Sequence, residues 1–173
     1  MSKDTSSPIQ HFDPEKVSKM FMARGHPGWL GLEYSAHGEN WVELKLPWNE
    51  KLLGEPDRPV LASGPIVSLL DMASGMSIWC THRTFTPVAT LDLRVDYQRP
   101  AKERAAVWGR VECYRITKSA AFVRGTAHDG DPEDTVATMA GVFMTLSVDP
   151  RDIGRKVKQQ AEARALDKET GNG

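Results

Sequence analysis

Residues 61–76 read Leu-Ala-Ser-Gly-Pro-Ile-Val-Ser-Leu-Leu-Asp-Met-Ala-Ser-Gly-Met and residues 89–97 read Ala-Thr-Leu-Asp-Leu-Arg-Val-Asp-Tyr, and these two runs decide the fold. Apolar residues surround nearly the whole circumference of the first run, which predicts a buried helix beginning near Ser63. Pro65 fits this start because the amides of the first helical turn have no partner within the helix. The second run alternates apolar and polar residues from 91 to 97, which predicts a strand.

One carboxylate, Asp71, lies in the middle of the predicted helix. Burying a carboxylate is costly unless something compensates the charge, so we expect a chain that surrounds Asp71 with apolar neighbours to use it. At about 100° per residue, Gly64, Ser68, Asp71 and Gly75 share one narrow stripe, which is small and polar enough for a ligand to approach closely. A structural role is the alternative, with the carboxylate capped by Ser68 or Ser74.

The rest of the chain predicts a second helix and several strands. The helix begins at Asp13, a capping residue followed by Pro14, and runs to about residue 24. Strands are expected at residues 30–36, 40–46, 105–115, 120–128 and 135–146. Adjacent strands joined by short turns indicate an antiparallel sheet. The predicted fold class is therefore α+β, with one long central helix wrapped by a curved antiparallel sheet.

Three segments are expected along the chain. Residues 1–12 are a disordered lead, residues 13–149 form a single domain, and residues 150–173 are a polar tail that forms a surface helix. Within the domain, residues 47–62 are expected to be a long loop, and long loops are often functional.

Composition excludes several classes of protein. A net charge of −1 leaves no basic footprint for nucleic acid or for an anionic membrane surface. The longest apolar stretch falls short of the roughly 20 residues that a membrane span needs, and the N-terminus shows no secretory signal, so a cytoplasmic protein is expected. Cys80 and Cys113 are expected to be buried free thiols. The histidines show no metal-ligand spacing, so no metal is expected.

The order of these motifs resembles the hotdog-fold acyl-CoA thioesterases, specifically the PaaI-like group, over roughly residues 40–147. The resemblance rests on a loop, a buried helix with an acid in its middle, and a strand that ends Val-Asp-Tyr-Gln-Arg-Pro-Ala at residues 95–101. In that group the helix usually follows His-Gly-Gly, with an acid nine residues after the His. Here the acid is Asp71 and the triplet is Ala62-Ser63-Gly64. The resemblance implies the hotdog fold and hydrolysis of an acyl- or aryl-CoA thioester.

The resemblance also implies a set of catalytic residues. The thioester carbonyl would sit at the helix N-terminus, where the N–H of Ser63 is the matching oxyanion donor and Gly64 allows close approach. Asp71 would activate water as a general base, or attack directly to give a mixed anhydride. Thr90 matches the Thr or Ser that the family carries before an apolar-Asp pair, and Asn49 is the candidate for an Asn in the preceding loop. Both would orient the water or hold the carbonyl.

The expected partner is a small-molecule acyl-CoA, with no metal or redox cofactor. Arg99 near a strand end is a candidate for binding the CoA phosphates, Ser68 on the polar stripe for contacting the substrate, and Trp79 for lining an acyl pocket. The family forms dimers through a shared sheet, often paired into tetramers, with sites between subunits. A homodimer or homotetramer is therefore expected.

Several ordinary roles and rival functions stay open. Thr90 could be a plain strand residue, because strand parity places it with Asp92 and Arg94 on a polar face. Asn49 could be a loop residue, and Ser63 could be a helix cap. Because Ala62-Ser63-Gly64 stands in place of His-Gly-Gly, a rival function is that of a hotdog protein that binds an acyl ligand without turnover. A hotdog dehydratase or hydratase is a further rival, but it needs a His paired with the acid, and no His is expected at the helix entrance.

Overall fold

The structure is a computed structural model that describes residues 13–145. The lead expected over residues 1–12 and the tail expected over residues 150–173 lie outside the described residues. In chain order the elements are α1 (Pro14–Met22), α2 (Gly25–Leu30), β1 (Glu33–His37), β2 (Trp41–Leu46), the 3-10 helix η1 (Glu50–Leu52), β3 (Leu53–Glu55), β4 (Arg58–Leu61), α3 (Ser63–His82), β5 (Val88–Tyr97), β6 (Val107–Ile116), β7 (Ala120–His128) and β8 (Thr135–Thr145).

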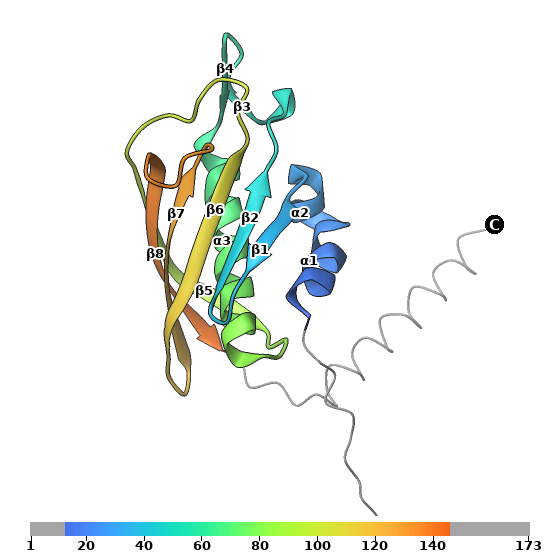
Figure 1. Ribbon diagram of the computed structural model, residues 1–173, viewed down its shortest axis with the longest axis vertical. Helices are drawn as coiled ribbons and strands as arrows, with labels where there is room; N and C mark the ends of the chain where they lie inside the picture. The colour runs from blue at the N-terminus through green and yellow to red at the C-terminus, as the bar shows by residue number, and fades with distance from the viewer. Residues whose placement is uncertain (1–12, 146–173) are drawn as a thin grey trace, which may run out of the picture.

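One antiparallel sheet wraps the long helix. Its strands lie in the order β1-β2-β6-β7-β8-β5, and β3 pairs with β4 in a separate hairpin. The sheet curves around α3, while α1 and α2 stand beside β1 (Figure 1). This arrangement confirms the predicted α+β hotdog fold with a central helix inside a curved antiparallel sheet.

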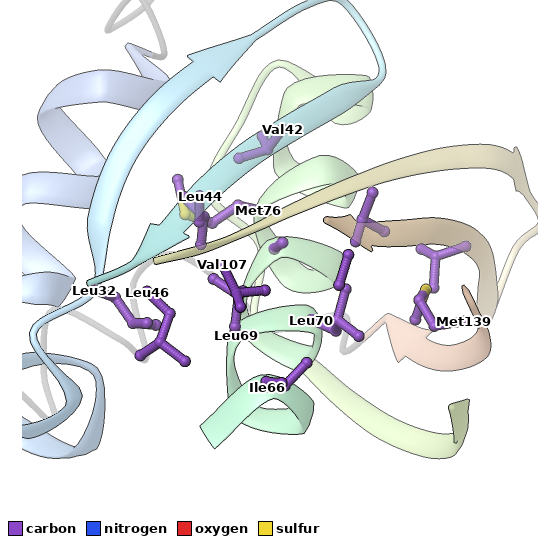
Figure 2. Packing of buried hydrophobic residues seen from close by; sticks show 14 of the residues in the cluster. Leu32, Val42, Leu44, Leu46, Ile66, Leu69, Leu70, Met76, Val107 and Met139 are labelled. Carbon is purple, nitrogen blue, oxygen red and sulfur yellow. The ribbon is translucent and has the colours of Figure 1, made fainter. Parts of the chain in front are cut away.

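The core lies between α3 and the strands. Ile66, Leu69, Leu70 and Met76 of α3 pack against apolar side chains of the sheet (Figure 2). The sheet side chains labelled in that view are Val42, Leu44, Leu46, Val107 and Met139. Gly109 of β6 lets the helix come close, because a Cβ there would lie 3.0 Å from Cγ of Leu69.

Four short elements occupy segments that the sequence predicted as irregular. The hairpin β3–β4 and η1 lie within the expected loop at residues 47–62, and α2 replaces an expected turn at Pro27-Gly28. Strands of three or four residues and helices of three or six residues are too short to show a periodicity in the sequence. Pro27 lies in the first turn of α2, where a missing N–H leaves no helical hydrogen bond unmade.

The two cysteines lie in the described part of the chain. Cys80 and Cys113 are both buried and free, as predicted. Burial raises the pKa of the Cys80 thiol to about 11. No helix within residues 13–145 is long and apolar enough to cross a membrane.

Candidate active site

The structure brings Asp71 and Thr90 together. Oγ1 of Thr90 on β5 donates a hydrogen bond of 2.8 Å to Oδ1 of Asp71 on α3. The bond spans 19 residues of sequence and joins the helix to the strand that follows it. Since Oδ1 accepts from Thr90, Oδ2 is the carboxylate oxygen that faces other partners.

A β-bulge gives Thr90 this orientation. Thr90 pairs with Phe143 and Asp92 pairs with Val142, so Leu91 is an extra residue in β5. Simple alternation predicts that Thr90 shares a face with Asp92, and this prediction is wrong because the bulge resets the alternation. Thr90 therefore turns toward α3, and Leu91 is left 60% exposed.

Asp71 is half-buried rather than buried. The sheet covers one side of α3, and the stripe that carries Ser68 and Asp71 lies at the edge of that cover. Ser68 is half-buried and Gly64 is exposed, whereas Gly75 at the far end of the stripe is buried. The carboxylate therefore keeps access from outside, which a group that meets substrate requires.

The N-terminus of α3 is open. Ala62 is its N-cap and makes no side-chain cap, so Ser63 is the first helical residue rather than the cap. The N–H groups of Ser63 and Gly64 have no acceptor within the helix, and they lie at the positive end of its dipole. A Cβ added to Gly64 would meet no atom within 4 Å. Oη of Tyr97 donates a 2.8 Å hydrogen bond to the carbonyl of Ser63, so β5 holds this turn as well as Asp71.

Asn49 has a local role in the described structure. It is the N-cap of η1, where its Oδ1 accepts a 3.0 Å hydrogen bond from the N–H of Lys51. None of its described hydrogen bonds reaches Asp71 or Thr90. A part for Asn49 in catalysis stays a prediction.

Arg99 forms a buried ion pair. Its Nη1 and Nη2 donate to the two oxygens of Asp129 at 2.7 and 2.8 Å, and its Nε donates to Asp134 at 2.8 Å. The remaining two N–H groups donate to the carbonyls of Pro100 and Asp134. All five donors are in use, so the structure places Arg99 as a brace between β5 and the turn after β7, with no donor left for a phosphate.

Replacing Asp129 with Asn is expected to lower the free energy of unfolding by about 3 kcal/mol at pH 7, because it leaves the Arg99 charge without its buried partner. The side chain of Asp129 is fully buried, and the Arg99 guanidinium holds the pKa of that carboxyl well below its usual range. A lowered pKa stabilises the fold above the unfolded-state pKa of about 4, and this stabilisation is lost as the pH falls below it. The free energies of unfolding of the wild type and the variant, measured in urea, should therefore differ at pH 7 and become equal at acidic pH.

Asp134→Asn is the matched comparison. Asp134 also pairs with Arg99, but its side chain is 54% exposed. An exposed pair contributes at most about 1 kcal/mol, so the loss is expected to be smaller than for Asp129→Asn. Equal unfolding midpoints for the wild type and Asp129→Asn would contradict the assignment of a structural brace.

Trp79 lies in the core and not at the candidate site. It is only 6% exposed and sits in the last turns of α3, far from Ser63. Its Nε1 donates to the carbonyl of Thr86 at 2.6 Å, and its ring packs against Phe21 and Phe85. The structure therefore does not place Trp79 in an acyl pocket.

The contact of His26 with α3 was not predicted from the sequence. Its Nε2 lies 3.2 Å from Oγ of Ser68, so a His does stand beside the first turns of α3, and the expectation of none there is wrong. None of the described contacts joins it to Asp71. His26 belongs to α2, which was itself not predicted, and its approach to Ser68 spans 42 residues. No local sequence signal could have revealed this contact.

Comparisons with known proteins agree with this geometry. The family model described as Thioesterase superfamily matches residues 60–136, which contain α3, Asp71 and Thr90. A crystal structure from Pseudomonas aeruginosa is 36% identical, covers 78% of this chain and 100% of its own, and superimposes with a TM-score of 0.70. A Thermoplasma acidophilum protein provisionally named an esterase is 27% identical over 69% of this chain and 88% of its own.

Among more distant structures, a Haemophilus influenzae thioesterase is 17% identical, covers 76% of this chain and 90% of its own, and superimposes with a TM-score of 0.68. The Escherichia coli PaaI protein from the phenylacetic acid degradation operon is 14% identical, covers 76% of this chain and 91% of its own, and gives a TM-score of 0.65. At these identities the likeness shows the fold alone. With its matched helix and strand, the chain carries a thioesterase-superfamily domain of the hotdog fold, the domain of a thioester hydrolase.

Proposed function

We propose that the protein hydrolyses an acyl-CoA or aryl-CoA thioester to the free acid and CoA, as a member of the PaaI-like group. The observation that carries this proposal is the hydrogen bond from Thr90 to Asp71 at the accessible edge of α3. Water adds to the thioester carbonyl, the carbon–sulfur bond breaks, and the CoA thiolate takes up the proton. Water is the only co-substrate that this step needs.

The two ends of the stripe have different tasks. The first-turn N–H of Ser63 stabilises the negative charge that develops on the carbonyl oxygen. Asp71 takes the proton of the attacking water, or attacks the carbonyl itself, while Thr90 fixes the orientation of its carboxylate. Thr90 occupies only Oδ1, so the second oxygen is available for the water.

One chain cannot bring its own Asp71 carboxylate into direct contact with a thioester carbonyl held at the N-terminus of its own α3. Gly64 and Asp71 are seven residues apart, which separates them by about 10 Å along the helix axis. A reacting atom must approach within about 3–3.5 Å of the carbonyl carbon. The carboxylate that attacks a carbonyl bound at one helix N-terminus must therefore come from a second copy of the chain.

The edge strand β5 is the surface through which we propose that two copies pair, as a homodimer or within a homotetramer. β5 ends the sheet order, so one row of its backbone groups has no partner strand within the described residues. Exposed edge strands of this length are normally covered or paired. Pairing through β5 also brings the helices and the Thr90 positions of the two copies toward one another.

The proposal is tested by measuring thiol release from short-chain, long-chain and arylacetyl CoA thioesters. We expect turnover of at least one class, with the acyl preference read from the ratios of kcat/KM. A folded protein that releases no thiol from any of these substrates would contradict CoA thioester hydrolysis and favour a protein that binds acyl ligands without turnover.

A further inference from the structure

Within the described residues, two backbone N–H groups stay open at the start of α3. An α-helix leaves the N–H groups of its N-cap and of its first three residues without helical partners. Here the N-cap, Ala62, donates its N–H to the carbonyl of Leu52 at 2.8 Å, and the third helical residue, Pro65, has no N–H. The open groups are therefore those of Ser63 and Gly64, at the positive end of the helix dipole.

Tyr97 binds the peptide that joins these two residues. Its hydroxyl donates a 2.8 Å hydrogen bond to the carbonyl oxygen of Ser63, which lies 34 residues earlier in the chain. The direction of this bond is fixed, because a carbonyl oxygen only accepts. Burial raises the pKa of the Tyr97 phenol above its ordinary value, so the phenol stays protonated at neutral pH. The bond is therefore present under the conditions in which the protein works.

The fold holds the Tyr97 side chain in place. β5 pairs Tyr97 with Ala137 of β8. Two residues further along, Arg99 is fixed by its two hydrogen bonds to Asp129. Ser63 and Tyr97 both line a cavity of about 360 Å³, which opens beside the first turn of α3. The bond between them thus lies on a rigid support and next to space that a ligand can enter.

A hydrogen bond to a peptide carbonyl makes the N–H of the same peptide a stronger donor. Electron density moves from the nitrogen toward the oxygen, and hydrogen bonds that are linked in a chain polarise one another in this way. The carbonyl of Ser63 and the N–H of Gly64 belong to one peptide unit. Tyr97 can therefore act on the N–H of Gly64 without touching the group that this N–H binds.

We propose that Tyr97 is a positioning residue for the hydrolysis, which polarises the peptide between Ser63 and Gly64 and so makes the N–H of Gly64 a second oxyanion donor beside that of Ser63. The inference rests on the proposed CoA thioester hydrolysis. The carbonyl oxygen gains negative charge as the nucleophile adds, so a strengthened N–H stabilises the transition state more than the bound substrate. The contribution of Tyr97 therefore falls on kcat rather than on KM.

Tyr97→Phe removes the hydroxyl and keeps the ring. We expect it to lower kcat for CoA thioesters about three- to tenfold, the effect of one neutral hydrogen bond, and to leave KM within about twofold. Tyr114→Phe is the matched control, because it removes the same group from a tyrosine on β6 that is 51% exposed, compared with 44% for Tyr97. Its kcat should equal that of the wild type.

An NMR measurement tests the polarisation without substrate. Labelling serine carbonyls with ¹³C and glycine nitrogens with ¹⁵N selects Ser–Gly peptides, and the chain has two of them, at residues 63–64 and 74–75. In Tyr97→Phe we expect the carbonyl carbon of Ser63 and the nitrogen of Gly64 to move upfield, because their peptide is no longer polarised by the phenol. The signals of the peptide at 74–75 should stay in place. Unchanged signals from the peptide at 63–64 would overturn the inference.

Tyr97→3-fluorotyrosine makes the opposite change and keeps the hydrogen bond. Its phenol is more acidic and a stronger donor, so the signals of the peptide at 63–64 should move downfield and kcat should rise. Wild-type signals and wild-type kcat in this variant would overturn the inference even if Tyr97→Phe did not fold.

The same experiments separate this inference from the proposed function. A wild type that hydrolyses no CoA thioester would overturn the proposed function, and with it the part of Tyr97 in the reaction. Turnover by the wild type with an unchanged kcat in both Tyr97 variants would overturn the role of Tyr97 alone.

Discussion

Replacing Asp71 with Asn is expected to lower kcat for CoA thioesters by about 10²–10⁴-fold, the usual contribution of a general base. Asn has the same shape and keeps an oxygen that accepts from Thr90, so the fold and the 2.8 Å contact should survive. What is lost is the second oxygen's ability to take a proton or to attack a carbon. The measurement is steady-state thiol release, together with the melting temperature of both proteins.

Asp92→Asn is the matched control for this experiment. Asp92 is an exposed carboxylate on the same strand as Thr90, and it lies on the opposite side of the bulge. Its replacement should leave kcat within about twofold, because distant surface substitutions rarely change a site. If Asp71→Asn kept the wild-type kcat, Asp71 would not be the catalytic carboxylate.

Isotope labelling distinguishes the two roles left open for Asp71. A single turnover in H₂¹⁸O transfers the label directly to the product acid if the carboxylate activates water. If the carboxylate attacks to form a mixed anhydride, water that attacks the carboxylate carbon leaves one ¹⁸O in Asp71, which mass spectrometry of the peptide detects. Label in Asp71 identifies the anhydride route, whereas an unlabelled Asp71 is expected both for the general base and for an anhydride that water attacks at the acyl carbon.

Replacing Ser63 with Pro is expected to lower kcat by about 10²–10³-fold, the usual effect of losing one oxyanion donor. Pro has no N–H, and the first helical position is where a helix accepts it best. The preceding residue, Ala62, has φ −65° and ψ 157°, which is the extended conformation that a following Pro requires. The change therefore removes one hydrogen from the site while the helix start is kept.

Ser63→Ala is the comparison, since it removes the same hydroxyl and keeps the N–H. The loss of kcat should be much larger for Ser63→Pro than for Ser63→Ala, with melting temperatures that differ little. Equal losses in the two variants would assign the effect to the side chain and would contradict a backbone oxyanion donor.

Mixing the two catalytic variants tests whether the site is shared between chains. In a refolded mixture of Ser63→Pro and Asp71→Asn, half of the dimers are mixed, and one of the two sites in each mixed dimer has both groups intact, so about a quarter of wild-type activity is expected. Activity equal to the sum of the separate variants would place both groups of one site in a single chain.

The sequence predicted the parts of the site that a periodic pattern reveals. The apolar pattern around Asp71 predicted the helix, and the alternation at residues 91–97 predicted the strand, so both carriers of the Asp71–Thr90 pair were foreseen. The orientation of the Thr90 side chain was not predicted, because a bulge adds one residue to a strand without changing its composition in a recognisable way. Periodicity describes an element, whereas a bulge belongs to the pairing of two strands.

Contacts between distant segments could not be predicted. Arg99 was expected at a phosphate, yet its partners Asp129 and Asp134 lie 30 and 35 residues further along the chain. His26 meets Ser68 through α2, a helix of six residues that is too short for a sequence pattern. In both cases the side chain was visible in the sequence, but its partner depended on the tertiary fold.

The bulge at Leu91 makes the spacing between Thr90 and Tyr97 in β5 important for the site. β5 touches α3 at Thr90 and again at Tyr97, and these two bonds orient the carboxylate and hold the first turn of α3. Inserting or deleting one residue between them would turn one of the two side chains to the wrong face, since alternation has a period of two. Substitutions at Leu91 leave that spacing intact. We therefore expect substitutions in this segment to be tolerated better than changes in its length.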